Sequence, residues 1–486
     1  MSVTETEAAD AAGSAVAEAP SALTGRLRLV LVMLLATQFM LAVDFAILNV
    51  ALPVIGKGLG FSLAHLQWIG TSFALCAAGF TLLFGRVADL FGRRRLFLGG
   101  LVVLGGASML GGLAQNPEML ITARVLQGLA TAAVTPAALS LMTTSFPEGP
   151  LRQKALGLNG ALMSSGFTTG AILGGVLTDL LSWRWAFFIN VPVALAVLVI
   201  APTVIKESRV DDRPKLDLPG ALTVTLGLLA VIFGLTQAGE KGWGSAGTLL
   251  PLAAGVLLLV LFRAIERRVS APLVPLGVLG RRSVAWGNVA GLIAFLTECS
   301  LVFPLTLYLQ DVLGFSPLAA GLSFGVLGLG TVTGGVTAPR VIGKLGSKQT
   351  LIVGGVLQAV FTFAMMGIGD DRAWLWLMLG ASFLGGIGNM LVIVGFMVTA
   401  TSGLADHEQG LATGLATMTQ QVGITMGTPI MSAVVTAAGA GAASILGGLR
   451  VAIGVNAGIV VLGLLTSAIF LRSDRTPASS RVLSRW

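Results

Sequence analysis

Long apolar runs decide what this chain can fold into. About fourteen of them are roughly 20 residues long, which is the length that an α-helix needs to cross a bilayer. Of the 486 residues, 55% are hydrophobic and 11% are charged, whereas a soluble domain has about 25% charged residues. The sequence therefore predicts an all-α polytopic membrane protein. The expected spans are 28–52, 65–86, 96–114, 118–142, 154–180, 185–205, 217–238, 246–266, 285–310, 317–340, 349–369, 374–400, 409–438 and 449–471.

The distribution of Lys and Arg predicts the orientation of these spans. With a cytoplasmic N-terminus, twenty-four of the 30 Lys and Arg residues fall on the cytoplasmic side. Short cytoplasmic loops retain Lys and Arg, so we expect both termini inside and an even number of spans. Residues 1–25 lack the basic start and apolar core of a signal peptide, and are interpreted as a disordered cytoplasmic tail.

One short stretch between two apolar runs, residues 85–95, holds four arginines and one aspartate. So many charges cannot lie in hydrocarbon, so the stretch is predicted to be a short cytoplasmic loop. Gly85 and Gly92 would let two helix ends turn sharply, and Asp89 is placed to pair with a neighbouring arginine. The alternative is a basic loop that only follows the topology rule.

The stretch resembles the motif G-x-x-x-D-x-x-G-R-R/K between helices 2 and 3 of the major facilitator superfamily. The matching residues are Gly85, Asp89, Gly92, Arg93 and Arg94. Leu90 stands where the family often has a basic residue. The resemblance implies that these residues take part in conformational gating on the cytoplasmic side.

A stripe of small residues in span 154–180 is the second motif. It consists of Gly166, Gly170, Gly174 and Gly175. Small residues let membrane helices pack closely, and simple packing is one reading of the stripe. The string 166–175 also resembles the antiporter motif G-x-x-x-G-P-x-x-G-G, with Ala171 in place of the proline.

Two further strings, 183–192 and 44–53, resemble the fourteen-helix drug:proton antiporter family of this superfamily. The resemblance implies a major facilitator fold of two six-helix bundles plus two inserted helices. It also implies export of amphipathic drugs or antibiotics in exchange for protons, and it favours a monomer. The expected domains are a tail 1–25, a bundle 26–205, a linker with two extra helices 206–283, a bundle 284–472 and a tail 473–486.

A weak internal repeat is consistent with two bundles. Residues 335–340, with Gly343 and Lys344, look like a diverged copy of the stretch 85–95. Many transporters are built from repeated halves, with the substrate site near the membrane midplane between them.

Two acidic residues fall inside predicted spans, Asp44 and Glu298. A charge at a helix centre costs about 2.5–3.5 kcal/mol, so such a residue faces a cavity or a partner. A carboxyl group in apolar surroundings can exchange protons near neutral pH, which makes Glu298 the leading candidate proton carrier and Asp44 the second. The alternatives are an ion pair that only joins helices for Asp44, and a neutral packing residue for Glu298.

Arg124 also lies within a span. Together with Gln127, Gly128, Thr131 and Thr135 it recurs at helical spacing, so one helix face is polar or small. A buried arginine needs a carboxylate or several carbonyls. The pattern resembles the fourth-helix motif R-x-x-x-G of the same superfamily, which is implicated in proton transfer. The predicted residues of the substrate cavity are Phe45, Asn49, Gln127, Asn159 and Phe303.

Several functions are disfavoured by missing patterns. The chain has no G-x-x-x-x-G-K-[ST] loop for ATP, no Cys/His cluster for a metal and no G-x-S-x-G nucleophile. We therefore expect no enzyme and no cofactor or metal. The net charge of +8 follows from loop arginines and does not indicate nucleic acid. The expected partners are an amphipathic small molecule, protons and the lipid bilayer.

Three alternatives stay open beside a drug exporter. They are a proton-coupled transporter of an endogenous metabolite with the same fold, a membrane sensor or channel, and a membrane enzyme. A channel would need pore-lining rings from several subunits. High Ala, Gly, Leu and Val with few Lys indicates a GC-rich bacterial gene, so the predicted location is a bacterial cell membrane.

Overall fold

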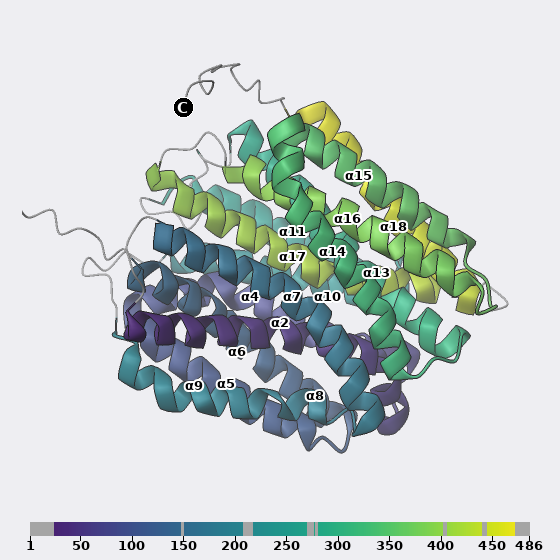
Figure 1. Ribbon diagram of the computed structural model, residues 1–486, viewed down its shortest axis with the longest axis horizontal. Helices are drawn as coiled ribbons and strands as arrows, with labels where there is room; N and C mark the ends of the chain where they lie inside the picture. The colour runs from purple at the N-terminus through teal and green to yellow at the C-terminus, as the bar shows by residue number, and fades with distance from the viewer. Residues whose placement is uncertain are drawn as a thin grey trace, which may run out of the picture.

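The computed structural model describes residues 24–146, 150–207, 217–269, 277, 280–401, 406–439 and 445–471, and it leaves some side chains within the helices undescribed. Within these ranges the chain is helical and contains no strand (Figure 1). The predicted tail 473–486, and all but the end of the predicted tail 1–25, lie outside the described residues. The principal helices are α2 (Gly25–Leu59), α3 (Leu63–Leu66), α4 (Trp68–Phe91), α5 (Arg93–Gly112), α6 (Pro117–Ser145), α7 (Pro150–Leu180), α8 (Trp185–Phe188), α9 (Asn190–Val204), α10 (Leu218–Lys241), α11 (Ala246–Glu266), α13 (Arg282–Leu307), α14 (Pro317–Leu345), α15 (Ser347–Ala364), α16 (Trp374–Thr401), α17 (Asp406–Gly439) and α18 (Ile445–Phe470). A π-helical turn, η1 (Tyr308–Val312), continues α13, and a 3-10 turn, η2 (Met365–Gly367), continues α15.

Twelve helices in the described part of the chain are long and apolar enough to cross a membrane. The prediction of an all-α polytopic membrane protein is thereby confirmed. Helices α4 and α7 occupy the expected spans 65–86 and 154–180 but are not among the twelve, and the apolar part of α4 is Trp68–Thr81. The count of fourteen spans therefore stays a prediction.

Local sequence signals set several helix starts. The Asn116 side chain accepts a hydrogen bond of 2.8 Å from the Met119 N–H at the start of α6. The Ser316 hydroxyl accepts one of 3.3 Å from the Ala319 N–H at the start of α14. In both helices a proline follows the capping residue. The cap satisfies a free N–H and the proline needs none, so both features favour a helix start there.

The long helices form two sets that repeat one packing pattern. In the first set (α2, α4, α5, α6, α7 and α9), α2 packs on α7, α4 packs on α6, and α5 packs on α6 and α9. In the second set (α13 to α18), α13 packs on α17, α14 packs on α16, and α15 packs on α16 and α18. The sets run at an angle to each other and meet through α7 with α14 and through α4 with α17 (Figure 1).

Hydrogen bonds across each set repeat as well. Arg26 donates from Nε to the Val204 carbonyl at 2.9 Å, and Arg282 donates from Nε to the Phe470 carbonyl at 2.6 Å. Each bond ties the start of the first helix of a set to the end of its last helix. The two sets are therefore copies of one arrangement at the level of single contacts.

A second pair of contacts has the same relation. Arg184 donates from Nη2 to the Ala114 carbonyl at 2.8 Å, and Arg450 donates from Nε to the Ile368 carbonyl at 2.7 Å. Arg184 directly precedes α8, and Arg450 lies in the first turns of α18. Each arginine binds a backbone carbonyl in the segment that follows α5 or α15. These pairs of contacts show which residues of the two helix sets are equivalent.

The charged stretch 85–95 is not the loop that the sequence predicted. Helix α4 continues to Phe91 and α5 begins at Arg93, so only Gly92 lies outside a helix, with φ of 109°. A helix satisfies its own backbone hydrogen bonds, and arginine stems reach toward water, so the charges do not require a loop.

The matching turn in the second set is at Gly346, with φ of 85°, between α14 and α15. The copy of the motif predicted at 335–344 was therefore placed a few residues too early. The backbone turn needs a glycine with positive φ. This requirement identifies the equivalent position in the second set better than the types of the neighbouring residues do.

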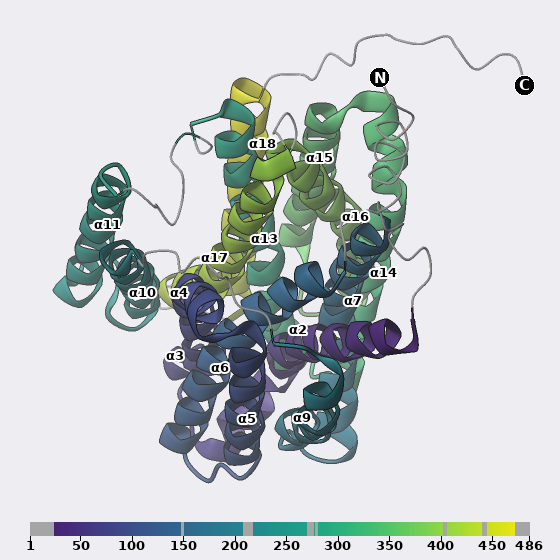
Figure 2. The ribbon, with the colours of Figure 1, turned by 90° about the vertical axis from the view of Figure 1, so that its left-hand side faces the viewer.

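Helices α10 and α11 form a hairpin beside the two sets (Figure 2). Helix α10 packs on both α4 and α17, while α11 packs on α10. At Gly239 of α10, an added Cβ would lie 3.1 Å from Gln67 Nε2 and 3.3 Å from Ala433 Cα of α17. Helix α10 thus contacts both sets at one residue.

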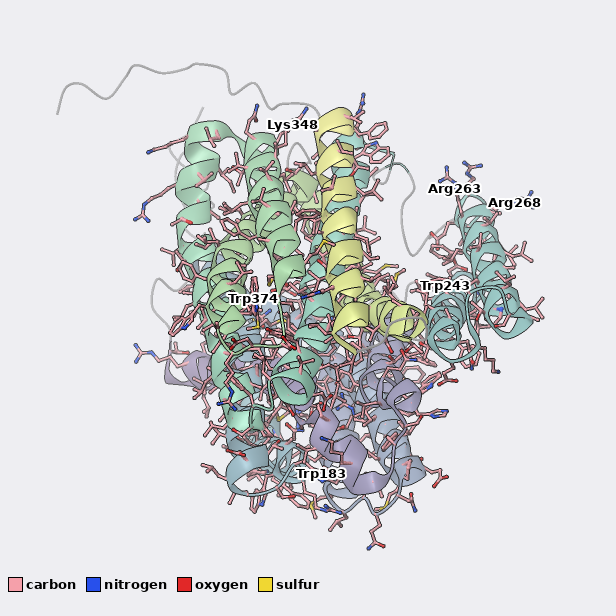
Figure 3. The ribbon with its side chains drawn as sticks, turned by 90° about the vertical axis from the view of Figure 1, so that its right-hand side faces the viewer. Trp183, Trp243, Arg263, Arg268, Lys348 and Trp374 are labelled. Atoms are coloured by element: carbon pink, nitrogen blue, oxygen red, sulfur yellow. The ribbon has the colours of Figure 1, made fainter. Side chains whose placement is uncertain are left out.

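Helix α11 faces outward. Its Leu250 and Leu257 are each 69% exposed, as expected for a surface that lies against lipid. Arg263 and Arg268 lie at one end of the hairpin and Trp243 lies toward the other (Figure 3). Arginine at one end and tryptophan at the other are typical of helices anchored at both faces of a membrane.

Candidate functional site

Asp44 and Arg124 form a buried ion pair between α2 and α6. Each side chain is 1% exposed, and Arg124 Nη1 lies 3.2 Å from Asp44 Oδ2. Arg124 Nε also donates to the Ile69 carbonyl at 3.0 Å, and its guanidinium lies 4.2 Å from the centre of the Phe73 ring. We predicted that a buried Arg124 would need a carboxylate or several carbonyls as partners. In the structure it binds one carboxylate and one carbonyl.

Three neutral side chains complete the network around Asp44. Gln127 donates from Nε2 to Asp44 Oδ1 at 3.2 Å and to Ser108 Oγ at 2.9 Å, and its Oε1 accepts from Arg124 Nη1 at 2.9 Å. Asn190 Nδ2 donates to Asp44 Oδ1 and, at 3.3 Å, to Ser108 Oγ. Four helices, α2, α5, α6 and α9, therefore converge on one carboxylate.

The sequence did not predict two members of this network. Asn190 lies in the string 183–192 that carried the family resemblance, but no pattern marked it as a partner of Asp44. Ser108 had no signal, because a single serine in a glycine-rich helix is not distinctive. Their roles follow only from the way that α5 and α9 pack.

A small cavity lies beside this network. Its lining combines apolar side chains with a few polar ones and comes from both helix sets. The lining residues are Phe45, Leu48, Asn49 and Leu52 of α2, Gly70, Thr71 and Ala74 of α4, Arg124 of α6, and Ile424, Thr425 and Thr428 of α17. Arg124 both lines the cavity and binds Asp44, so it connects the cavity to the carboxylate.

Two of the five residues predicted to line the substrate cavity line this cavity. Phe45 and Asn49 line the cavity, whereas Gln127 lies within the network beside it. Asn159 of α7 and Phe303 of α13 are not among the lining residues; Asn159 Nδ2 lies 3.9 Å from Met163 Sδ, and Phe303 is 4% exposed in an apolar core. A sequence places a residue on a helix but does not fix which neighbour that face of the helix meets.

Glu298 lies apart from this network, on α13. It is half-buried, next to the buried Thr297 and Cys299. It makes no hydrogen bond or ion pair with another described residue and does not line the cavity. The structure therefore does not bring Glu298 together with Asp44 and Arg124, and its role as a proton carrier stays a prediction.

The motif at residues 85–94 lies at the turn between α4 and α5. The Arg94 N–H donates to Glu207 Oε1 at 3.1 Å, and Arg95 Nε lies 3.9 Å from Glu207 Oε2. A Cβ on Gly92 would lie 2.7 Å from Glu207 Oε1, whereas one on Gly85 would make an ordinary contact with Pro136. Arg93 begins α5, and the Asp89 side chain lies outside the described ones. The predicted gating role stays a prediction.

The glycine stripe of α7 packs on the helix that carries Asp44. A Cβ on Gly166 would lie 3.2 Å from the Phe39 carbonyl, one on Gly170 would lie 2.7 Å from the Val43 carbonyl, and Gly174 meets the backbone at Ile47. Side chains larger than hydrogen at these positions would push α2 away. The stripe therefore fixes the position of α2 next to α7.

The last glycine of the motif faces the other helix set. A Cβ on Gly175 would lie 2.5 Å from the Pro317 carbonyl and 3.2 Å from Gly321 Cα of α14. Gly321 in turn lies against the Ala171 carbonyl. This part of α7 forms a close, side-chain-free contact between the two sets.

Two repeated sets of membrane helices, with a buried ion pair beside a cavity that both sets line, define a membrane transporter. The chain belongs to the major facilitator superfamily, because the family model described as Major Facilitator Superfamily matches residues 34–428. This confirms the family that the motifs predicted. Membership also agrees with the expectation that the chain is a transporter and not an enzyme.

The chain is similar to bacterial antibiotic exporters and resistance proteins. It is 38% identical over 405 residues to the cephamycin export protein CmcT of Amycolatopsis lactamdurans, covering 82% of this chain and 83% of that protein. It is 38% identical over 467 residues to the puromycin resistance protein pur8 of Streptomyces alboniger, covering 92% of each. These bacterial relatives indicate a multi-pass protein of the cell membrane.

Solved transporter structures share the fold. A bacterial homologue of the human lysosomal transporter Spinster, in an inward-facing and unoccupied conformation, has a TM-score of 0.65 at 17% identity and covers 94% of this chain and 100% of that chain. A mutant of the nucleoside transporter NupG has a TM-score of 0.62 at 13% identity, and the match covers 92% of this chain and 100% of that chain. At these identities the likeness shows the fold alone.

Proposed function

We propose that the protein is a proton-coupled secondary transporter that exports drugs or antibiotics across the cytoplasmic membrane by alternating access. The observation that carries the proposal is the buried Asp44–Arg124 pair at the edge of a cavity lined by both helix sets. The export and resistance proteins among its relatives support the proposed direction of transport and the proposed class of substrate.

The ion pair offers a physical route from proton binding to substrate release. Protonation of Asp44 removes the charge that holds the Arg124 guanidinium, and Arg124 lines the cavity. The charge and shape of the cavity wall would then depend on the proton, so proton and substrate would compete. Protonation changes the populations of the two facing states only by the difference in its free energy between them.

The lining of the cavity is compatible with an amphipathic substrate. Phe45, Leu48 and Leu52 offer apolar surface, while Asn49 and Thr428 offer hydrogen-bonding groups. A ligand pocket with mostly apolar walls and a few polar groups orients its ligand through the latter.

The remaining parts of the proposal rest on sequence and topology. Glu298 is a second proton-carrier candidate, and the motif 85–94 would stabilise the closed cytoplasmic side. The chain forms two six-helix bundles, 26–205 and 284–472, with two inserted helices and fourteen spans in all. Both termini are cytoplasmic, and the protein is a monomer. The orientation is supported by Lys348 and Arg263, which lie toward one end of the molecule, whereas Trp183 lies toward the opposite end (Figure 3).

Proton-driven uptake into inverted membrane vesicles tests the proposal. The vesicles are energised, lipophilic drugs and antibiotics are added, and both ΔpH and drug accumulation are followed. Wild type is compared with Asp44→Asn and Glu298→Gln, and with Glu118→Gln as a control, because Glu118 is an exposed acid at the start of α6.

We expect accumulation that an uncoupler abolishes, that fails in Asp44→Asn, and that Glu118→Gln retains. Accumulation that neither the uncoupler nor either of the first two variants changes would refute proton coupling. Uptake of metabolites with no uptake of any drug would instead favour the transporter of an endogenous metabolite.

A further inference from the structure

Two buried asparagines occupy equivalent places in the two helix sets. Asn190 follows Arg184 by six residues, and Asn456 follows Arg450 by six residues. The two arginines make the repeated hydrogen bonds described above. Both asparagine side chains are 0% exposed, so neither is a surface residue that happens to align.

The partners of these asparagines are also equivalent. Asp44 follows Arg26 by eighteen residues, and Ser300 follows Arg282 by eighteen. Asn190 Nδ2 donates to Asp44 Oδ1, and Asn456 Nδ2 donates to Ser300 Oγ at 2.7 Å. The same interhelical hydrogen bond therefore ends on a carboxylate in the first set and on a hydroxyl in the second.

We propose that Asn190 is a positioning residue that stabilises the charged Asp44 carboxylate, and that the Asn456–Ser300 pair is its uncharged counterpart. The coupling charge of this repeated site is then confined to the first helix set. The inference rests on the proposed proton coupling through Asp44, and it adds a role for a residue that no motif assigned.

The chemistry of the contact supports this role. An amide N–H can only donate, and a hydrogen bond to an ionised acceptor is stronger than one to a neutral acceptor. Asn190 therefore favours the carboxylate over the carboxylic acid at Oδ1, whereas Asn456 holds a hydroxyl whose charge does not change.

Among the described residues, one other charge interacts with Asp44. Among the described residues, α6 contributes Arg124, while α5 and α9 contribute the neutral Ser108 and Asn190. Helix α7 presents glycine backbone to this part of α2, and none of the described acids or bases of α4, α13 or α14 interacts with Asp44. The contacts of Arg124 with Asp44, Gln127 and the Ile69 carbonyl do not involve Asn190, so we expect Arg124 to stay in place when Asn190 is replaced. A change in proton binding can then be assigned to Asn190.

The two asparagines provide a matched pair of variants, Asn190→Leu and Asn456→Leu. Each wild-type amide is fully buried, donates two hydrogen bonds and has an Oδ1 with no described partner. Both replacements keep the branching and the number of heavy atoms of the side chain, and both remove the same number of donors. The measurement is the pH profile of proton-driven drug transport in proteoliposomes.

We expect the midpoint of the profile for Asn190→Leu to move to higher pH by about one unit, since the charged form of Asp44 loses one donor. We expect the midpoint for Asn456→Leu to equal that of wild type. An unchanged midpoint for Asn190→Leu, or an equal shift for Asn456→Leu, would overturn the inference.

A second measurement separates this inference from the proposed function. The infrared carboxyl signal that disappears in Asp44→Asn reports protonation without transport, and Asn190→Leu should move its midpoint in the same direction. If wild type shows no proton-driven transport, the proposed function fails, while this signal still decides whether Asn190 holds Asp44. Asn190→Ser, whose shorter side chain withdraws the donor, carries the same expectation if Asn190→Leu does not reach the membrane.

Discussion

Lys57 Nζ lies 3.6 Å from Asp311 Oδ1, and this ion pair joins the last turn of α2 to η1 in the other helix set. Gln310 Nε2 donates beside it to the Val50 carbonyl at 2.7 Å. Both contacts lie in the half of α2 that ends at Leu59, so they hold the two sets together at the predicted outer side. The Lys57 side chain is 81% exposed, and such surface pairs contribute little.

Gln310→Leu should therefore open the outer side more than Lys57→Gln does. The loss of one net hydrogen bond of about 1 kcal/mol corresponds to a roughly fivefold change in the ratio of outward-open to inward-open molecules. Spin-label distances between α2 and α14 would measure this ratio. A larger change for Lys57→Gln than for Gln310→Leu would contradict the assignment.

Filling the cavity should block transport without unfolding the protein. Gly70 lines the cavity, and a Cβ added there meets no atom within 4 Å. Gly70→Leu is therefore expected to abolish drug accumulation while the melting temperature stays close to that of wild type. Gly458→Leu, at another position with no atom within 4 Å, is the control and should transport normally.

Gly170→Leu should destabilise the protein. A Cβ at this position would lie 2.7 Å from the Val43 carbonyl, so α2 and α7 would have to separate. Overpacking of this kind typically costs about 1–3 kcal/mol, which thermal unfolding in detergent would detect. The reference variant is Gly106→Leu, where the added side chain meets open space and the melting temperature should not change.

The Asp44–Arg124 pair should show strong coupling in a double-mutant cycle. Removal of one partner of a buried pair costs about 3–5 kcal/mol, because the other charge stays buried and unpaired. Asp44→Asn and Arg124→Gln should each destabilise the protein, and the double variant should be more stable than Arg124→Gln alone, yet inactive. Additive losses of stability would show that the two charges do not depend on each other.

The sequence predicted the fold class because apolar length and arginine placement depend on the bilayer, which acts on every span in the same way. It also predicted that Arg124 needs a buried carboxylate or several carbonyls, since a guanidinium inside a membrane must be paired. Asp44 was predicted to face a cavity or a partner because it is an acid inside a span, although Glu298 was ranked above it as the candidate proton carrier.

Features that depend on the rotation of one helix against another were not predictable. Asn190 reaches Asp44, and Ser108 reaches Asn190 and Gln127, only because α9 and α5 pack as they do. Phe303 was predicted to line the cavity, but its side chain lies in an apolar core. The single-residue turn at Gly92 was missed because charge density indicates where the hydrocarbon ends and not where a helix ends.

The position of α10 has a mechanical consequence. Gly239 touches Gln67, beside α4, and Ala433, within α17, so one helix rests on both sets at the same level. Any rotation of one set against the other must then make α10 slide along at least one of these surfaces. The inserted hairpin therefore lies where the two sets would move past each other, and at Gly239 it presents no side chain to either of them.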